Sequence, residues 1–416
     1  MVIGKRVNPL IIAVFISVFL IFSKVFPFPK RKAFNSVFAT SRITGVYGKV
    51  ISSPSINSKQ TFYTMDFQLI EAEGKGGKGT AYGKITLYIP PEIIEVYFPG
   101  RLFSLGVLKG GTFIEDGSIL FVKGNFIKES FYVKEVVSCD FEKQRFIALK
   151  KIRALARLHF KRLMFEWKDA GGLLLSLLSG SREYTKAELS DSFRKAGLSH
   201  VLALSGMHLS ILMGIAVFLG NKIKVYRLML ILQFISITIF VWFAGFSPSL
   251  LRAFICSIVL LFEDITAVRK SSMIEVLSFS FLVQAVIRPD DLFTLGFVLS
   301  YGALVGILLF GNMFRRFYTR FTPKVLAQSL SASTGAQACT VPVSLKYFGS
   351  ISPVGIISTV FVSPLISIFI YGGLIFIILC LIFPPLTGLC GIFLNLLYNL
   401  IVILVDFFSR FPLITV

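Results

Sequence analysis

Three polar side chains interrupt an otherwise apolar stretch, at His200, Ser205 and His208 of the sequence SHVLALSGMH. We expect them to share one helix, in which the three-residue step from Ser205 to His208 allows a hydrogen bond. A serine beside a histidine could be the nucleophile and base of a hydrolase, but that chemistry also needs an orienting group and an oxyanion pocket, which the sequence does not supply. Because ionisable side chains in apolar helices usually face a pore or another helix, we predict that role and no enzymatic activity. Gly206 would let a second helix approach closely.

A second polar group opens another apolar segment, at Pro248, Ser249 and Arg252. Proline in the first turn and serine as a cap are typical of a helix start. Arg252 carries a permanent charge, which could extend to the membrane surface, pair with Asp290 or Asp291, or bind a phosphate group. The sequence leaves these three outcomes open.

A third polar group, Gln337 and Thr340, lies in the segment SASTGAQACTVPVS, which is small and polar for a helix in contact with lipid. Such segments occur where they face protein or a water-filled cavity. Together with Gly335 they predict donors on a closely packed or unwound stretch, as in the interrupted helices of transporters. The candidates for pore lining or cargo contact are therefore His200, Ser205, Gly206, His208, Pro248, Ser249, Arg252, Gln337 and Thr340.

Basic residues recur between 141 and 168 at three- and four-residue steps, interleaved with apolar ones. This pattern predicts a basic amphipathic helix. It could lie on anionic lipid headgroups or contact the phosphates of a nucleic acid. The DNA-binding candidates are Lys143, Arg145, Lys150, Arg153, Arg157, Lys161 and Arg162.

Histidine and cysteine are too sparse for a metal centre. The chain has three His and five Cys residues, and four of the cysteines lie in apolar segments. Neither the spacing of a thiolate zinc site nor a disulfide framework is present. We expect no bound metal and no cofactor.

The elements that position these residues follow from composition. The chain has 416 residues, 55% of them hydrophobic, with 43 Lys and Arg against 22 Asp and Glu. Such a composition excludes an ordinary soluble domain and a disordered chain, and apolar runs of about 20 residues predict a polytopic α-helical membrane protein. We expect spanning helices near 197–220, 225–245, 248–262, 271–287, 292–314, 326–348, 352–382 in part and 386–409, some of them interrupted at Pro342, Pro353 or Pro364.

Four regions divide the chain. Residues 1–40 read as a membrane anchor helix, with a cleaved signal peptide as the alternative. Residues 41–140 contain short alternating strands, including TMDFQLI and KITLYI, and a glycine-rich hairpin at 74–79, which predict a small all-β domain of OB-like type or a β-sandwich. Residues 141–195 form the basic helical connector, and 196–416 the multi-span bundle.

Aromatic residues of the β domain could stack on bases if they are exposed, although aromatic residues in alternating strands more often form a core. These residues are Phe62, Tyr63, Phe67, Tyr82, Tyr88, Tyr97, Phe98 and Phe103.

Basic residues in the predicted loops indicate an orientation. Successive loops hold three, zero, two, one, four and one Lys or Arg residues. By the positive-inside rule the richer loops are cytoplasmic, which places the β domain and the basic helix outside the cytoplasmic membrane. Lys30, Arg31 and Lys32, just after the anchor, argue for the opposite orientation.

Four ordered segments resemble motifs of the ComEC family of inner-membrane DNA-uptake proteins. They are AGLSHVLALSGMHLSIL at 196–212, AGFSPSLLRAFIC at 244–256, RPDDLFTLGFVLSYGALVGILLF at 288–310 and SASTGAQACTVPVSLKYFGSISP at 331–353. In the third, Asp291 stands where the family motif usually has Pro. The anchor and the β domain also resemble the N-terminal part of the family, in texture more than in letters.

The resemblance implies that one DNA strand crosses the cytoplasmic membrane during natural transformation. It also implies a DNA receptor on the outer face and a cytoplasmic motor, because no nucleotide-binding P-loop occurs in the sequence. Membrane lipid and further copies of the chain are other expected partners. Many family members carry a C-terminal metallo-β-lactamase-like domain with an H-x-H-x-D-H signature, which these 416 residues lack. We therefore expect a short form, in which strand degradation belongs to another protein. A transporter of another anionic solute or lipid intermediate is the alternative.

Overall fold

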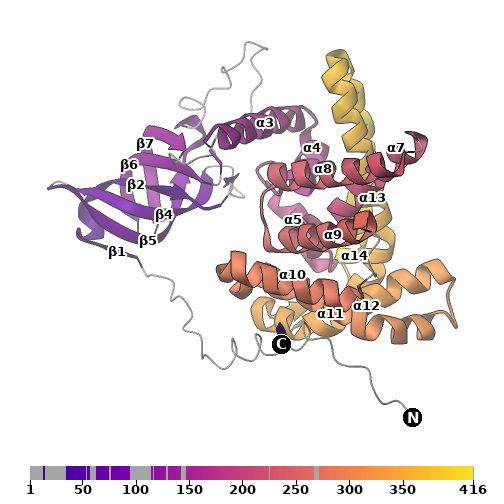
Figure 1. Ribbon diagram of the computed structural model, residues 1–416. Helices are drawn as coiled ribbons and strands as arrows, with labels where there is room; N and C mark the ends of the chain where they lie inside the picture. The colour runs from indigo at the N-terminus through magenta and orange to yellow at the C-terminus, as the bar shows by residue number, and fades with distance from the viewer. Residues whose placement is uncertain are drawn as a thin grey trace. The chain divides into compact units, whose positions relative to one another are not determined.

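A computed structural model describes residues 13–14, 34–52, 54–56, 62–74, 76–93, 114–115, 117–127, 130–141, 147–223, 225–266 and 271–415. The predicted anchor within 1–40 lies almost entirely outside this range. Contacts divide the chain into two compact units. The helical unit contains residues 1–29, 190–371 and 400–416, and the barrel unit contains residues 30–189 and 372–399. The predicted connector at 141–195 thus falls mostly within the barrel unit. Figure 1 labels the elements of both units.

The β domain is a closed ring of five strands. Strands β2 (Ile43–Val50), β4 (Tyr63–Gly74), β5 (Gly77–Ile89), β6 (Ser118–Ile127) and β7 (Ser130–Phe141) pair in the order β2-β4-β5-β7-β6 and back to β2. All these pairs are antiparallel except β5 with β7, which is parallel and closes the ring. Two short strands, β1 (Asn35–Ser36) and β3 (Ser55–Ile56), extend β5 and β4 respectively.

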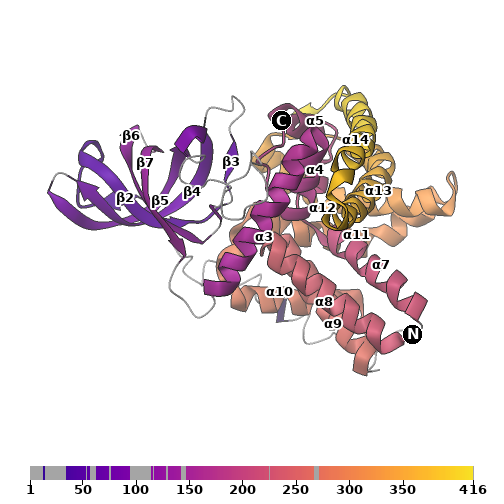
Figure 2. The same cartoon turned by 90° about the horizontal axis from the view of Figure 1, so that it is seen from above.

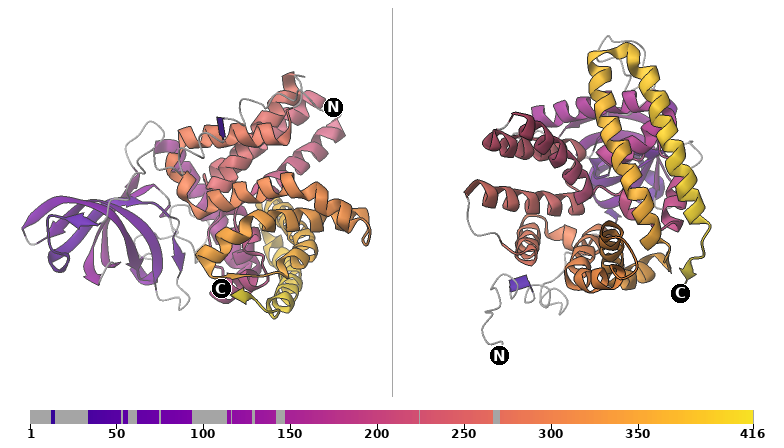
Figure 3. Two further views of the ribbon diagram at one scale, coloured as in Figure 1. Left: turned by 90° about the horizontal axis from the view of Figure 1, so that it is seen from below. Right: turned by 90° about the vertical axis from the view of Figure 1, so that its right-hand side faces the viewer.

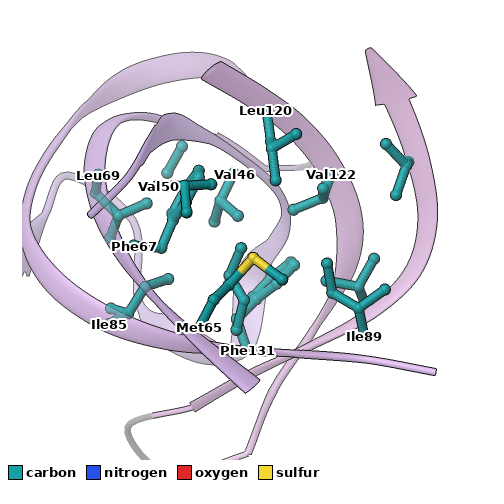
Figure 4. Close-up of a cluster of buried hydrophobic side chains, with 14 of the residues drawn as sticks. Val46, Val50, Met65, Phe67, Leu69, Ile85, Ile89, Leu120, Val122 and Phe131 are labelled. Carbon is teal, nitrogen blue, oxygen red and sulfur yellow. The ribbon is translucent and has the colours of Figure 1, made fainter. Parts of the chain in front are cut away.

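The barrel interior is filled by the residues that the alternation predicted. Met65, Phe67 and Leu69 of β4 are all at most 3% exposed, and their neighbours Asp66 and Gln68 point outward. Ile85, Leu87 and Ile89 of β5 are likewise buried. Figure 4 shows these side chains meeting Val46, Leu120 and Val122 from other strands. The predicted half-buried strands are therefore confirmed, and the glycine-rich segment at 74–79 forms the β4–β5 hairpin.

Two glycines lie at irregularities that bend the barrel strands. The pairing register shifts between Tyr47 and Gly48 in β2 and between Lys123 and Gly124 in β6. A Cβ on Gly48 would lie 2.1 Å from the carbonyl oxygen of Gln68. Bulges increase local twist, and glycine permits the close backbone approach that a small closed barrel needs.

Buried charges tie the barrel to the basic helix α3 (Ile147–Glu166). Glu115, which precedes β6, forms ion pairs with Arg157, whose Nε lies 2.8 Å away, and with Lys161, whose Nζ lies 3.1 Å away. Lys161 Nζ also lies 3.1 Å from Glu183, which follows α4 (Lys168–Ser179). All four side chains are at most 4% exposed. We call these four residues the buried ion cluster.

The ion cluster shifts its own pKa values. Burial alone would raise the pKa of Glu115, but Lys161 and Arg157 outweigh it and hold the pKa below the ordinary value. Burial would lower the pKa of Lys161, but Glu115 and Glu183 raise it overall. Burial dominates at Glu183 and raises its pKa. The cluster is thus stable as charged pairs only while each cation keeps its carboxylates.

Trp167 joins the α3–α4 junction to the helix α14 (Thr387–Ser409) within the barrel unit. Its indole Nε1 donates to the carbonyl oxygen of Thr387 at 3.0 Å, and its own carbonyl accepts from Asn395 Nδ2 at 3.1 Å. A Cβ on Gly391 would lie 3.0 Å from the indole ring. The next residue, Lys168, adopts a φ of 53°, so the junction is a sharp corner between two helices.

The helical unit follows the predicted order of segments. It contains α6 (Ser199–Leu202), α7 (Gly206–Ile223), α8 (Tyr226–Ala244), α9 (Pro248–Thr266), α10 (Met273–Ile287), α11 (Leu295–Tyr318) and α12 (Lys324–Phe348), followed by most of α13 (Gly355–Ile382). The short helix α5 (Ala187–Lys195) leads into it. Figure 2 shows α7, α8 and α9 as neighbours. The predicted interruptions at Pro342 and Pro364 are wrong, because α12 and α13 continue through these residues, and Pro353 precedes α13.

Four segments among the described residues are long and apolar enough to cross a membrane, namely Tyr226–Ala244, Leu295–Tyr318, Gly355–Ile382 and Pro384–Ser409. Gly206–Lys222 and Met273–Ile287 are apolar but shorter. Of the other predicted spans, α9 carries Arg252, Glu263 and Asp264, and α12 is rich in small polar residues. The fold is thus mainly helical, with apolar spanning segments and a β region near its N-terminus.

Helices α11 and α12 form a hairpin with direct backbone contact. A Cβ on Gly306 would lie 2.1 Å from the carbonyl oxygen of Gly335, and one on Gly335 would lie 3.1 Å from that of Gly306. Tyr318 and Thr334 share a hydrogen bond of 3.0 Å nearer the turn. Figure 3 shows the two helices side by side. Small residues at such contacts allow the packing that drives helix association in lipid.

We predict that Lys161→Met destabilises the protein by about 3 to 5 kcal/mol, because it leaves Glu183 without a cation. Thermal unfolding of the full chain in detergent measures the effect. Lys186→Met, which removes an exposed pair with Asp169, is the control and should cost at most about 1 kcal/mol. The penalty at Lys161 should shrink as the pH falls toward 4.5, the ordinary pKa of a glutamate, because burial raises the pKa of Glu183 in the folded protein and its stranded carboxylate therefore takes up a proton above that pH. A penalty that does not change with pH would contradict this account.

We predict that Gly306→Ala separates α11 from α12 and lowers the melting temperature, because the new methyl group meets backbone atoms that cannot move aside. Gly311→Ala, on the same helix, is the control. A Cβ there contacts only Ile307 at 3.7 Å, so this variant should melt at or above the wild-type temperature. Equal losses from both variants would show that the close contact does not determine packing.

Candidate functional site

The helix predicted to hold His200, Ser205 and His208 is broken. Helix α6 ends at Leu202, Ala203 is extended with ψ 136°, and α7 begins at Gly206. His200 is exposed on α6, Ser205 lies in the break, and His208 is buried in the first turn of α7. The prediction of one continuous helix is therefore wrong.

The imidazole of His208 caps the start of α7. Its Nδ1 accepts the backbone N–H of Ser205 at 3.1 Å, and the Ser205 hydroxyl lies 3.4 Å from the same atom. A helix start leaves N–H groups without an intrahelical partner, and His208, three residues after Ser205, accepts one of them as a glutamate or glutamine does in a capping box. Among the described residues no carboxylate orients the ring, and its Nε2 has no partner. The geometry is that of a helix cap, which explains why the chain can stop and restart here.

The first turn of α9 contacts this break. Ser249 Oγ donates to the carbonyl oxygen of Leu204 at 2.5 Å. Pro248 is the first residue of α9, and its carbonyl oxygen accepts Gln284 Nε2 at 3.2 Å. The structure thus brings two of the predicted groups together. This contact does not require a glycine at position 206, because a Cβ on Gly206 would lie 3.5 Å from the Cβ of Ala253, an ordinary contact distance.

Arg252 lies inside the helical unit, 8% exposed. Its Nη1 donates to the carbonyl oxygen of Ser300 in α11, and its guanidinium lies 5.9 Å from the centre of the Tyr301 ring. Its Nη2 is 3.8 Å from the position that a Cβ on Gly206 would take. The side chain therefore does not extend to the surface, the first of the three predicted outcomes.

The second predicted outcome, an ion pair with Asp290 or Asp291, does not occur either. Asp291 lies 3.5 Å from Arg288 Nε and accepts Gln284 Nε2 at 3.3 Å, while Asp290 is exposed. Among the described residues no carboxylate pairs with Arg252. Of the three predicted outcomes, the contacts of the described residues leave phosphate binding open.

A chain of hydrogen bonds beside Arg252 was not predicted. Ser280 Oγ and the Tyr301 hydroxyl are 3.1 Å apart, and that hydroxyl donates to Gln284 Oε1 at 3.2 Å. Gln284 continues to Asp291 and so to Arg288. Ser280, Gln284 and Tyr301 lie in the apolar helices α10 and α11, and Asp291 lies in the turn between them. A glutamine and a tyrosine inside apolar helices are the sequence signal that could have predicted this chain. We call Ser280, Tyr301, Gln284 and Asp291 the polar chain.

Gln337 and Thr340 lie elsewhere in the helical unit. Helix α12 is continuous at both residues, so the unwound stretch is not present, whereas the close packing at Gly335 is. Thr340 Oγ1 donates to Ala336 within its own helix at 3.0 Å. Gln337 Nε2 faces the start of α13, 3.0 Å from the position of a Cβ on Gly355. Neither residue hydrogen-bonds to Arg252 or His208 in the described part of the chain.

The basic helix presents fewer charges than its sequence indicated. Arg157 and Lys161 are buried in the ion cluster, and Arg162 is 4% exposed. Carboxylates remote in sequence, Glu115 and Glu183, neutralise the first two, which corrects their prediction as surface contacts for DNA. Lys150 and Arg153 are partly exposed on α3, together with the exposed Lys151. Lys143 and Arg145 lie outside the described residues.

The aromatic candidates of the barrel divide between interior and surface. Phe67 belongs to the core. Tyr88 stacks on Tyr132 with centroids 4.8 Å apart, and Phe62 packs edge-on against both rings. Tyr82 is 46% exposed. Tyr63 is half-buried in β4, and Tyr97, Phe98 and Phe103 lie outside the described residues.

We predict that His208→Ala destabilises the protein by about 1 to 3 kcal/mol, because it leaves the Ser205 N–H without an acceptor. Ser205→Ala, the matched control, retains that N–H and its acceptor and should change stability by less than about 0.5 kcal/mol. Thermal unfolding of both variants in detergent separates the two effects. An equal loss in Ser205→Ala would show that the hydroxyl, and not the backbone, is the partner that matters.

Comparison with known proteins identifies relatives of the helical region. A family model described as "Competence protein" matches residues 177–416. ComE operon protein 3 of Bacillus subtilis (strain 168) is 27% identical over 206 residues, which cover 49% of this chain and 26% of that protein. An uncharacterized protein of Aquifex aeolicus (strain VF5) is 27% identical over 355 residues, covering 77% of this chain and 81% of that protein.

No solved structure matches the chain. The chain aligns with only about a quarter of the length of the Bacillus subtilis relative. The family model, in contrast, matches the break before α7, the turn before α9 and the whole of α11 and α12, more than half of the chain. The chain belongs to the Competence protein family, and within that family it resembles ComE operon protein 3 of Bacillus subtilis, a ComEC protein.

Proposed function

We propose that this protein carries single-stranded DNA across the cytoplasmic membrane during natural transformation. The observation that carries the proposal is the match of the competence family over 177–416, which includes every helix that contributes to the site around Arg252. Competence is the uptake of DNA, and a polyanion is the cargo that a buried cation without a carboxylate would suit. The chain itself provides a path, and a DNA receptor outside and a motor inside provide delivery and force.

The barrel supports a receiving role. Its five strands have the pairing order of an OB-type barrel, in which the second and third strands form the face that binds oligonucleotides. These are β4 and β5, whose outward side presents the exposed Tyr82 and Lys78. We propose that the barrel is of this type and lies outside the cytoplasmic membrane, as the basic loops α7–α8 and α11–α12 indicate.

Charge and stacking then act at different places. Among the described residues of α3, Lys151 is exposed and Lys150 and Arg153 are partly exposed, whereas Arg157 and Lys161 are buried in the ion cluster. Aromatic rings bind bases of any sequence, and cations bind the backbone, so neither contact demands a particular DNA sequence. We propose uptake without sequence preference at this step.

We predict that the purified full chain binds oligothymidylate and that Lys150→Gln with Lys151→Gln weakens the binding. Each lost phosphate contact on a single strand lowers the slope of log affinity against log salt by about 0.7, so the double variant should lose about 1.4. Fluorescence anisotropy at several salt concentrations measures both values. Lys186→Gln, whose partner is Asp169, serves as the control.

DNA uptake by cells tests the proposed transport directly. Deletion of the gene in a transformable host should abolish DNA uptake, and the wild-type chain should restore it. Unchanged uptake after deletion would contradict the DNA proposal and favour transport of another anionic solute or of a lipid intermediate. Uptake restored by Ser205→Ala would exclude the remaining enzymatic alternative, a hydrolase with that nucleophile.

A further inference from the structure

Arg252 is a buried permanent charge with no carboxylate partner among the described residues. An arginine keeps its proton at any physiological pH, so it cannot lose its charge as a buried lysine can. Its contacts are the Ser300 carbonyl oxygen, the Tyr301 ring and the start of α7, all of them uncharged. An uncompensated charge in a low-dielectric interior is strongly destabilising. The contrast with the ion cluster, where each buried cation has a carboxylate within 3.1 Å, shows that this chain can supply partners when it needs them.

The surroundings of Arg252 increase the positive potential. Its Nη2 faces Gly206, the first residue of the 18-residue helix α7. The first N–H groups of a helix have no intrahelical acceptor, and together with the aligned peptide dipoles they attract an anion. A cation at this end of a helix is placed unfavourably unless an anion lies between the two.

Hydrogen-bond donors near Arg252 are also unused. Its Nε is buried without a partner, and so is the Ser300 hydroxyl, on the residue whose carbonyl binds Nη1. Neither is accounted for by any other contact among the described residues. An oxyanion with several acceptor atoms could satisfy a guanidinium, a hydroxyl and backbone N–H groups together.

We propose that Arg252, the Ser300 hydroxyl and the N-terminus of α7 bind a phosphodiester group of the transported DNA strand. The inference rests on the proposed function and adds the contact that the cargo makes inside the helical unit. A phosphodiester carries one negative charge, which matches the single uncompensated charge of Arg252. A phosphodiester also repeats along the strand, so each step of transport presents the site with the same group.

The position of Arg252 favours DNA over a lipid as the source of this group. The guanidinium is enclosed by α7 through Gly206 and by α11 through Ser300 and Tyr301, and it lies on α9. A phospholipid would have to place its acyl chains between these packed helices together with its phosphate group, whereas a DNA strand carries no acyl chains. Lipid binding is therefore an alternative that the experiment must separate.

The test compares Arg252→Met with the wild type in melting temperature and DNA uptake. Without ligand, Arg252→Met should melt at a higher temperature, because methionine removes a charge that has no partner. Oligothymidylate should raise the melting temperature of the wild type and not that of Arg252→Met, and uptake should fall at least about tenfold. Arg252→Lys should retain part of the response, since lysine keeps the charge but not the planar donor pair. Arg316→Met, an exposed position at the end of α11, is the control and should respond as the wild type does.

Three results would overturn the proposal. If Arg252→Met melts at a lower temperature and still responds to oligothymidylate, Arg252 is an interhelix contact to Ser300. If nanodiscs of phosphatidylglycerol raise the wild-type melting temperature through Arg252 and oligothymidylate does not, the site binds a lipid. If Arg252→Met restores normal uptake to a deletion strain, the site does not contact the cargo, although the transport function itself then stands. Conversely, an Arg252-dependent response to oligothymidylate together with unchanged uptake after gene deletion would support the site and reject the transport proposal.

Discussion

The cost of placing a charge where water is absent governs both units of this protein. In the barrel unit the cost is met internally, because Glu115 and Glu183 lie against Arg157 and Lys161. In the helical unit the described contacts of Arg252 are to the Ser300 carbonyl dipole and the Tyr301 ring. The ion cluster fixes the barrel to helix α3 through buried ion pairs. The arrangement around Arg252 leaves a buried charge without a carboxylate in the described part of the chain, and we propose that a phosphate group of the cargo pairs with it.

Burial of basic side chains changes what the net charge of the chain says about its surface. The chain has a net charge of +21, and the sequence predicted that the basic residues of 141–168 form an amphipathic helix in contact with lipid headgroups or nucleic-acid phosphates. The structure moves three of its basic side chains into the interior, where two of them pair with carboxylates. Helix α3 is therefore partly an architectural element, and the DNA contact that we propose for it involves only its exposed face. A count of charges cannot make this distinction, because it does not record where a carboxylate returns from a remote part of the chain.

Much of the fold could be predicted from sequence, and the limits have physical causes. Strand alternation identified Met65, Phe67 and Leu69 as core residues, because burial on one face of a strand imposes a period of two. Helix order was equally readable from apolar length. The break at Ala203–Ser205 was missed because no proline marks it, and the cap comes from His208, a residue seldom used that way. At Pro342 and Pro364 the sequence predicted interruptions that do not occur. Helices α12 and α13 continue through these prolines, because the packing of neighbouring residues outweighs the lost hydrogen bond. Of the site, Arg252 was recognised, but Gln284 and Tyr301 come together only through tertiary folding.

The contact between Gly306 and Gly335 has a mechanical consequence. With no side chain between the two backbones, α11 and α12 cannot slide along each other without a collision between a carbonyl oxygen and a neighbouring main chain. We therefore expect the hairpin to move as one rigid lever. Arg252 is attached to this lever at the Ser300 carbonyl oxygen, so any tilt of the hairpin would pull on the guanidinium. Displacement would then be absorbed by the extended residues before Gly206, which lack helical hydrogen bonds and so offer the least resistance.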